Sequence, residues 1–148
     1  MQKPLVIGLG NPLRGDDGFG VLVARQLLDR NDIDCQILHG NATEILAAWH
    51  DYARVLILDA MDIKGEAPGT LRDIDLTKEA LPARFFTSSS HGMGIYEALE
   101  LGKVLDDCPQ ELPRGQSGIV VCCNISKYIS VPVGTVNSLI AATCNYMT

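Results

Sequence analysis

Short apolar runs, bounded by glycine or polar residues, are spaced along the whole chain. The run at residues 5–9 and its counterpart at Val55–Leu58 contain no polar residue, which is typical of strands buried on both faces of a parallel sheet. We expect strands at residues 5–9, 34–38, 54–59 and 119–123, a short edge strand at 70–74 and a further strand at 85–87.

Between these runs, apolar residues recur every three or four positions, the pattern of an amphipathic helix. We expect helices within residues 21–30, 43–49, 95–105 and 136–143, the second with Thr43 as its N-cap. The first helix should bury Val21, Ala24, Leu27 and Leu28, and the third Ile95, Ala98, Leu99, Gly102 and Leu105.

Strands that alternate with helices in this way specify an α/β fold of three layers, in which a mostly parallel, twisted sheet carries helices on both faces. The length of 148 residues predicts a single domain that spans residues 1–148. In such sheets, ligands bind beyond the carboxyl ends of the strands. Side chains that follow the strands are therefore the first candidates for function.

Charge and cysteine content narrow the function classes. A formal net charge of −6 and a pI near 4.9 argue against a nucleic-acid or anionic-membrane partner. The first apolar run is too short for a signal peptide or a membrane span, so we expect a cytoplasmic protein. We also expect a monomer. The five cysteines contain no Cys-x-x-Cys pair, which favours reduced core thiols over disulfides or a zinc ribbon.

Two carboxylates and an imidazole are the candidate metal ligands. Asp17 lies in a glycine-rich turn after the first strand, Asp59 ends the third strand, and His91 lies in a polar turn. Such a set suits zinc, nickel or manganese, and three protein ligands leave positions open for a substrate. Asp17 and Asp59 are also the candidate catalytic residues. The flanking residues expected to contact the substrate are Gly15, Asp16, Gly18 and Gly92.

Each of these residues also has an ordinary structural explanation. Asp16 is expected to cap the first helix, and Asp59 can cap the turn that follows it. A single histidine such as His91 is most often a surface residue. His39, at the end of the second strand, is a reserve ligand, whereas His50 lies at a helix end where it can pair with the helix dipole.

Four ordered segments together resemble one enzyme family. They are the motif from Val6 to Gly20, Asp59 within Leu56–Ala60, the turn Ala67-Pro68-Gly69-Thr70, and Ser90-His91. In this order they are similar to the nickel-iron hydrogenase maturation endopeptidases, peptidase family A31. The resemblance covers roughly the first two-thirds of the chain.

The resemblance implies an aspartic-type, cytoplasmic endopeptidase that removes a C-terminal extension from the large subunit precursor of a nickel-iron hydrogenase. By matching position, Asp17, Asp59 and His91 would contact nickel. The precursor would supply that nickel, held partly by its own cysteines, so that metal loading permits cleavage. Nickel can then act as a Lewis acid, or as a docking point while Asp17 or Asp59 acts as general base.

Other readings compete with this one. Gly8-Leu9-Gly10-Asn11-Pro12 also opens the peptidyl-tRNA hydrolases, but an acidic chain binds tRNA poorly. A non-enzymatic, nickel-sensing chaperone of the same subunit would use the same three ligands. A serine nucleophile within residues 88–90 lacks the Gly-x-Ser-x-Gly elbow, and dinucleotide binding lacks the third glycine of its fingerprint.

Overall fold

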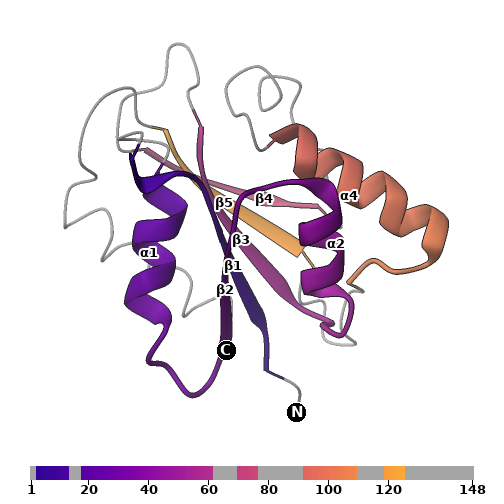
Figure 1. The fold of residues 1–148 in the computed structure, drawn as a ribbon, viewed down its shortest axis with the longest axis horizontal. Coiled ribbons are helices and arrows are strands. Elements are labelled where there is room, and N and C mark those ends of the chain that lie inside the picture. The colour runs from indigo at the N-terminus through magenta and orange to yellow at the C-terminus, as the bar shows by residue number, and fades with distance from the viewer. Residues whose placement is uncertain (1–2, 14–17, 62–69, 77–91, 110–118, 126–148) are drawn as a thin grey trace.

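A five-stranded sheet forms the centre of the protein. The computed structural model describes residues 3–13, 18–61, 70–76, 92–109 and 119–125 (Figure 1). The strands are β1 (Leu5–Leu9), β2 (Asp34–Leu38), β3 (Val55–Met61), β4 (Thr70–Asp75) and β5 (Ile119–Ile125), in the order β2-β1-β3-β5-β4. β4 is antiparallel to β5, and all other pairs are parallel. The predicted parallel sheet and the short edge strand are thus confirmed.

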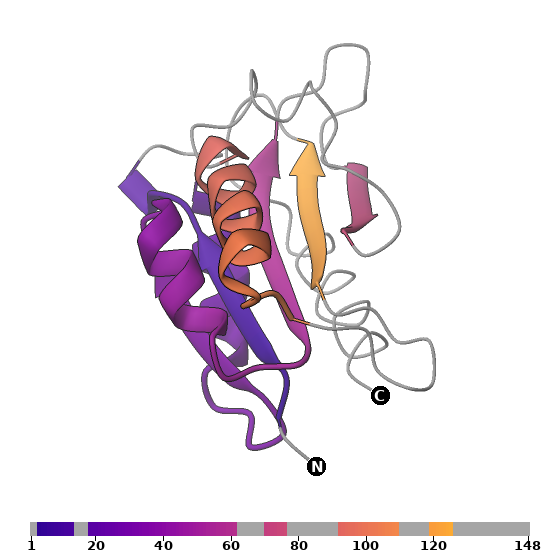
Figure 2. The ribbon, with the colours of Figure 1, turned by 90° about the vertical axis from the view of Figure 1, so that its right-hand side faces the viewer.

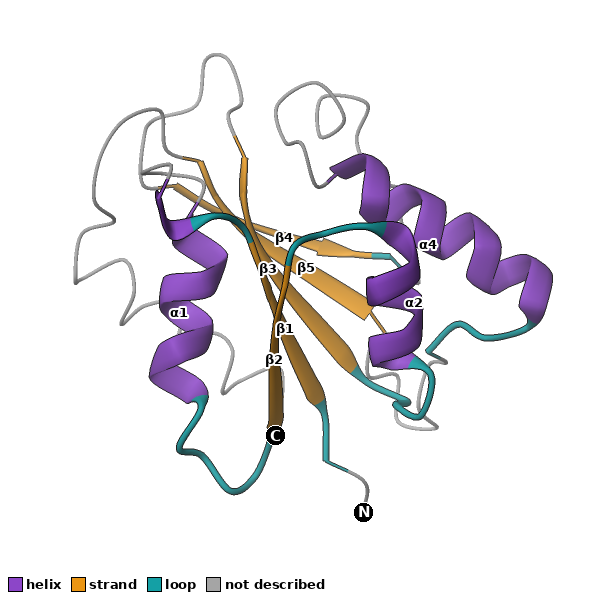
Figure 3. Ribbon diagram, in the orientation of Figure 1, coloured by secondary structure: helices purple, strands orange, loops and turns teal. Residues whose placement is uncertain are grey.

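Helices cover both faces of this sheet, as the pattern predicted (Figures 1 and 3). Helix α1 (Phe19–Leu27) packs on one face, whereas α2 (Ala42–Trp49) and α4 (Gly92–Leu105) pack side by side on the other (Figure 2). Successive strand residues point to opposite faces. The core under α1 contains Val6, Phe19, Val23, Leu27, Leu56 and Leu58, and the core under α2 and α4 contains Leu5, Ile7, Ile45, Trp49, Ile57, Ile74 and Ile95.

Some details at the helix ends differ from the prediction. Asn41 rather than Thr43 is the N-cap of α2, because its backbone is extended and its side chain accepts a hydrogen bond from the Glu44 N–H at 2.9 Å. Leu28 and Leu105 are 52% and 58% exposed. Each lies where its helix ends, so neither stays over the sheet.

The C-terminal ends of α2 and α4 are joined through Asp107. Trp49 Nε1 donates to the Asp107 carbonyl at 2.9 Å, and His50 Nδ1 lies 2.8 Å from Asp107 Oδ2. The Asp107 and Asp106 N–H groups donate to the Gly102 and Lys103 carbonyls. Asp106 has a φ of 54°, so α4 ends in a Schellman motif with an aspartate where glycine is usual.

The remaining predicted elements, the strand at 85–87, the turn at 65–69 and the helix at 136–143, lie outside the described residues. Among the helices that the structure describes, none is both long and apolar enough to cross a membrane.

Candidate functional site

The parallel strands bring their carboxyl ends to one edge of the sheet, which we call the carboxyl edge. β1 leaves the sheet through Gly10, whose φ of 139° suits only glycine. The next residue, Asn11, accepts the Leu13 N–H through Oδ1 at 2.9 Å. The loop that leads from β1 toward the predicted Asp17 is therefore held tightly at its start.

Asp59 is the one predicted metal ligand that lies among the described residues. It lies inside β3, opposite Cys123 of β5, and its side chain is fully buried. Its Oδ1 accepts the Ala60 N–H at 2.8 Å. Ile57 belongs to the core under α2 and α4, so alternation places the Asp59 carboxylate on that same face. Burial of a charged carboxylate is unfavourable in free energy unless hydrogen bonds or a cation stabilise the charge. The position of Asp59 therefore makes it a candidate for a functional role.

Helix α1 begins directly against the two central strands. A Cβ atom on Gly20 would overlap the carbonyl oxygens of Leu9 and Leu58, so only glycine permits this approach. Gly18 is the N-cap of α1, which corrects the assignment of that role to Asp16. A Cβ on Gly18 would lie 2.7 Å from Pro12 Cα. The chain is thus fixed on both sides of residues 14–17, beside the strand that carries Asp59.

Helix α4 begins at the same edge, on the face that carries Asp59. Its first residue is Gly92, the residue after His91. A Cβ on Gly94 would overlap the carbonyl oxygen of Gly40, which follows β2. The first turn of α4 therefore rests on the loop at the carboxyl end of β2, and Figure 1 shows this turn at the same end of the molecule as the start of α1.

The predicted site residues divide into two groups. Asp59, Gly18 and Gly92 are described at the carboxyl edge, whereas Gly15, Asp16, Asp17 and His91 lie outside the described residues. Within the described part of the chain, no three His, Cys, Asp or Glu side chains gather closely enough to hold a metal. The three-ligand set therefore stays a prediction, supported by the placement of Asp59 and of the residues that adjoin Asp17 and His91.

The other two histidines have surface partners. His39 follows β2 at the carboxyl edge, but its side chain is 91% exposed and its Nδ1 lies 3.7 Å from Glu44 Oε1. His50 is the C-cap of α2, where the hydrogen bond with Asp107 raises its pKa and the charges of Asp107 and Asp51 add to that effect. The predicted position of His50 at a helix end is confirmed, and its main side-chain partner there is Asp107.

The thiols whose surroundings are described are poor nucleophiles at neutral pH. Burial raises the pKa of the Cys35 thiol to about 11, and burial also raises the pKa of Cys108. Cys35 donates to the Ala24 carbonyl, and Cys108 to the Leu99 carbonyl. Because the thiolate is the reactive form, these two residues serve packing, as the cysteine pattern predicted.

Arg72 is a site neighbour that the sequence did not reveal. Cys123 of β5 pairs with Asp59 on one side and with Arg72 of β4 on the other, so the three residues form one row across the sheet. Ile74 lies in the core under α2 and α4, and alternation therefore places Arg72 on the face of Asp59. The Arg72 side chain is half-buried.

Comparison with known proteins agrees with this architecture. The family model for HycI, described as hydrogenase maturation protease, matches residues 39–133. That match lies beyond the opening motif shared with peptidyl-tRNA hydrolases. The chain is 35% identical over 115 residues to the hydrogenase expression/formation protein HoxM of Cupriavidus necator, covering 73% of this chain and 55% of HoxM.

A relative from Escherichia coli is covered over more of its own length. The chain is 31% identical to the hydrogenase 2 maturation protease of Escherichia coli, over 75% of this chain and 70% of that protein. It spans only about half the length of HoxM and of two curated HupD relatives.

Solved structures show the same fold. The hydrogenase maturating endopeptidase HybD of E. coli superposes with a TM-score of 0.68 at 19% identity, over 97% of this chain and 88% of that one. A [NiFe] hydrogenase maturation protease HybD of Thermococcus kodakarensis gives 0.72 at 19% identity, over 99% and 100%. On the family match and the E. coli relative together, the chain belongs to the hydrogenase maturation protease family.

Proposed function

We propose that this protein is an endopeptidase that cleaves a C-terminal extension from the nickel-loaded large subunit precursor of a nickel-iron hydrogenase. It would act in the cytoplasm and as a monomer. Family membership supports a peptidase of hydrogenase maturation. The precursor, its nickel and the position of the cut are parts of the proposal.

The observation that carries this proposal is the buried Asp59 carboxylate in β3, near the edge of the sheet at which α1 and α4 begin. Gly18 opens α1 directly after Asp17, and Gly92 opens α4 directly after His91. Both helix starts are fixed at the carboxyl edge through glycine contacts. This arrangement favours a shared site for the three predicted ligands, with Gly15, Asp16, Gly18 and Gly92 along the path of the substrate.

The ligand chemistry fits a nickel ion carried by the substrate. Carboxylate oxygen and imidazole nitrogen suit a borderline divalent ion, and a set of three leaves positions for ligands that the precursor keeps. Bound there, nickel would polarise a carbonyl or water, or dock the precursor. A carboxylate base at Asp59 or Asp17 is favoured over Cys35 or Cys108 as a nucleophile, since the pKa values of these two thiols are raised.

The test is processing of purified precursor, with and without nickel. The wild-type protein should release the C-terminal peptide only from the nickel-loaded precursor. Asp59→Asn should lower kcat/KM by about 100-fold or more while the fold is kept. Asp17→Asn and His91→Gln should cause losses of the same order. Asp51→Asn is the matched control, because this carboxylate is 86% exposed at the end of α2.

The assay also separates this function from its alternatives. A stable complex with the loaded precursor, with no peptide released, would identify a nickel-sensing chaperone instead. Equal cleavage of the nickel-free precursor would show that cleavage does not depend on nickel loading. Full activity of Asp59→Asn would remove this carboxylate from the site.

A further inference from the structure

The outer edge of β2 is open in the part of the chain that the structure describes. β2 stands at the end of the sheet order, and of the described strands only β1 pairs with it. The Asp34 N–H donates to the chain just before β1 at 3.0 Å, so the backbone groups of Asp34, Gln36 and Leu38 face β1. The N–H and C=O groups of Cys35 and Ile37 therefore point outward.

These outward groups are accessible, and the edge ends at a fixed point. No described residue hydrogen-bonds to the outward backbone groups of Cys35 or Ile37, and Ile37 is 39% exposed. His39 is the next residue whose N–H points outward, and this N–H donates to Glu44 Oε2 at 3.2 Å. The Glu44 side chain thus occupies the position that a longer added strand would need. The open edge is limited to the stretch around Cys35 and Ile37.

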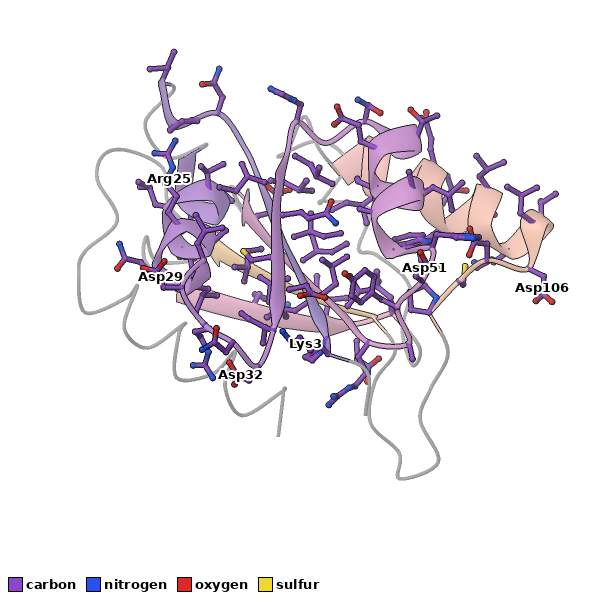
Figure 4. The ribbon with its side chains drawn as sticks, turned by 60° about the horizontal axis from the view of Figure 1, so that its bottom comes forward. Lys3, Arg25, Asp29, Asp32, Asp51 and Asp106 are labelled. Atoms are coloured by element: carbon purple, nitrogen blue, oxygen red, sulfur yellow. The ribbon has the colours of Figure 1, made fainter. Side chains whose placement is uncertain are left out.

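This open edge lies close to the candidate site. Ile37, Gly8 and Leu58 occupy one row across β2, β1 and β3, and Leu58 directly precedes Asp59. Neighbouring strands lie about 4.8 Å apart, so roughly 10 Å separate Ile37 from the residue beside Asp59, a distance that about three extended residues span. In Figure 4 the chain enters β2 from the labelled Asp32, and the strand runs from there toward the carboxyl edge.

We propose that the outer edge of β2 binds the C-terminal extension of the precursor as an added, antiparallel strand. This inference rests on the proposed function. A strand added in this direction exchanges two backbone hydrogen bonds with Cys35 and two with Ile37. Alternate apolar side chains of the extension cover the exposed Ile37 side chain. Glu44 ends the pairing at His39, where the bound chain turns toward Asp59.

The chemistry of the edge favours an extended peptide, and its location favours the extension. A row of backbone donors and acceptors recognises a strand rather than a small molecule. The part of the precursor that follows the cut starts at the carboxyl edge. If it continues along β2 from there, it runs opposite to β2, the direction in which pairing is slightly more stable per residue. Recognition through the backbone also accepts extensions of varied sequence.

The first test is amide hydrogen exchange of the wild-type protein, measured by NMR with the synthetic extension peptide. This peptide is the product of the proposed reaction, so it is not cut. Bound peptide should slow exchange at Cys35 and Ile37 by about 10-fold, whereas Gln36 and Leu38, already paired with β1, should change little. Unchanged exchange at Cys35 and Ile37 in millimolar peptide would overturn the proposal. Slow exchange there without peptide, increasing with protein concentration, would overturn it too, because a second copy would then occupy the edge.

The second test is processing of the nickel-loaded precursor by Ile37→Pro. The Ile37 N–H faces outward, so proline removes a donor to the extension and no hydrogen bond to β1. KM should rise on the order of 10-fold while kcat stays nearly unchanged, because the edge contributes equally to substrate and transition-state binding. Ile37→Ala is the matched control, since it keeps the N–H, and its KM should change much less. An unchanged KM in Ile37→Pro, or an equal rise in Ile37→Ala, would contradict recognition through the backbone.

Circular dichroism checks that Ile37→Pro is folded. The exchange test uses the wild-type protein, so it decides the proposal even where this variant does not fold. It also keeps the inference separate from the proposed function. Failure of the wild type to cleave loaded precursor would reject the protease, whereas exchange at Cys35 and Ile37 in the presence of the peptide decides the role of β2.

Discussion

The two ends of the helical layers are held by different kinds of contact. At the carboxyl edge, α1 and α4 touch backbone carbonyls through Gly20 and Gly94, with no room for a side chain. At the opposite end, α2 and α4 are joined by side-chain and backbone hydrogen bonds around Asp107. A backbone contact cannot adjust to an added atom, whereas hydrogen bonds can be lost one at a time. Substitutions should therefore cost most at the edge that carries the candidate site.

The largest effect is expected for Gly20→Ala. The new Cβ would overlap two strand carbonyls, so α1 must shift away from β1 and β3. We expect the free energy of unfolding to fall by about 3 kcal/mol, and processing to fall with it because Leu58 adjoins Asp59. Urea denaturation measures the first effect. Gln26→Ala, on the exposed side of α1, is the control, and equal stability of the two variants would contradict the rigid contact.

A smaller loss is expected for Trp49→Phe at the other end. The buried indole donates its N–H to the Asp107 carbonyl, and phenylalanine leaves that carbonyl without this donor and the core less full. The expected cost is about 2 kcal/mol. Circular dichroism during denaturation measures it, since Trp49 is the only tryptophan. Processing of the folded variant should be unchanged, and a selective loss of activity would show that the two ends are coupled.

A substitution at Asp106, the residue before Asp107, should stabilise the protein. Asp106 adopts a φ of 54° at the end of α4, a conformation that glycine adopts without strain. Asp106→Gly should raise the free energy of unfolding by about 0.5 kcal/mol. Asp106→Ala is the matched control and should lower stability, because alanine lacks both the freedom of glycine and the local hydrogen bonding of aspartate. If Asp106→Ala were more stable than Asp106→Gly, the left-handed backbone at residue 106 would not be the source of the difference in stability.

Much of the fold followed from local patterns. The strands at 5–9 and 34–38 occur as predicted. The first is a continuous apolar run with flanking breaks, a signal that is encoded within a few residues. The errors at Thr43, Leu28 and Leu105 all fall at helix ends. Asn41 and Thr43 are both good caps, and only the path of the incoming chain decides between them.

Site residues could be predicted from the sequence where the pattern of a single strand indicates them. They could not be predicted where their position depends on the order of the strands in the sheet. Asp59 stood out because it ends an apolar run, although pairing with β5 extends β3 to Met61 and places Asp59 inside the strand. No pattern in the sequence indicated that Arg72 lies near Asp59. Its proximity to Asp59 arises because β5, far along the chain, lies between β3 and β4. The spacing of residues along the sequence does not indicate that β5 lies between β3 and β4.

The smallest expected effect is a pH dependence at the Asp107 end. Hydrogen bonding to Asp107 raises the pKa of His50 above its usual 6.5. The protonated imidazole is therefore favoured in the folded state. Its contribution to stability is fully present below about pH 6.5 and is lost as the pH rises through the higher folded-state pKa. His50 is largely exposed, so solvent screening keeps this contribution small.

The melting temperatures of wild type and His50→Gln should accordingly differ more at pH 5.5 than at pH 8.5. Asp107→Asn keeps the backbone carbonyl that accepts from Trp49 but removes the carboxylate. In this background, His50→Gln should shift the melting temperature by nearly the same amount at both pH values. If the pH dependence survives there, another group is responsible. If it disappears, the ends of α2 and α4 share an ion pair that weakens gradually with pH, unlike the glycine contacts at the carboxyl edge, which contain no group that titrates.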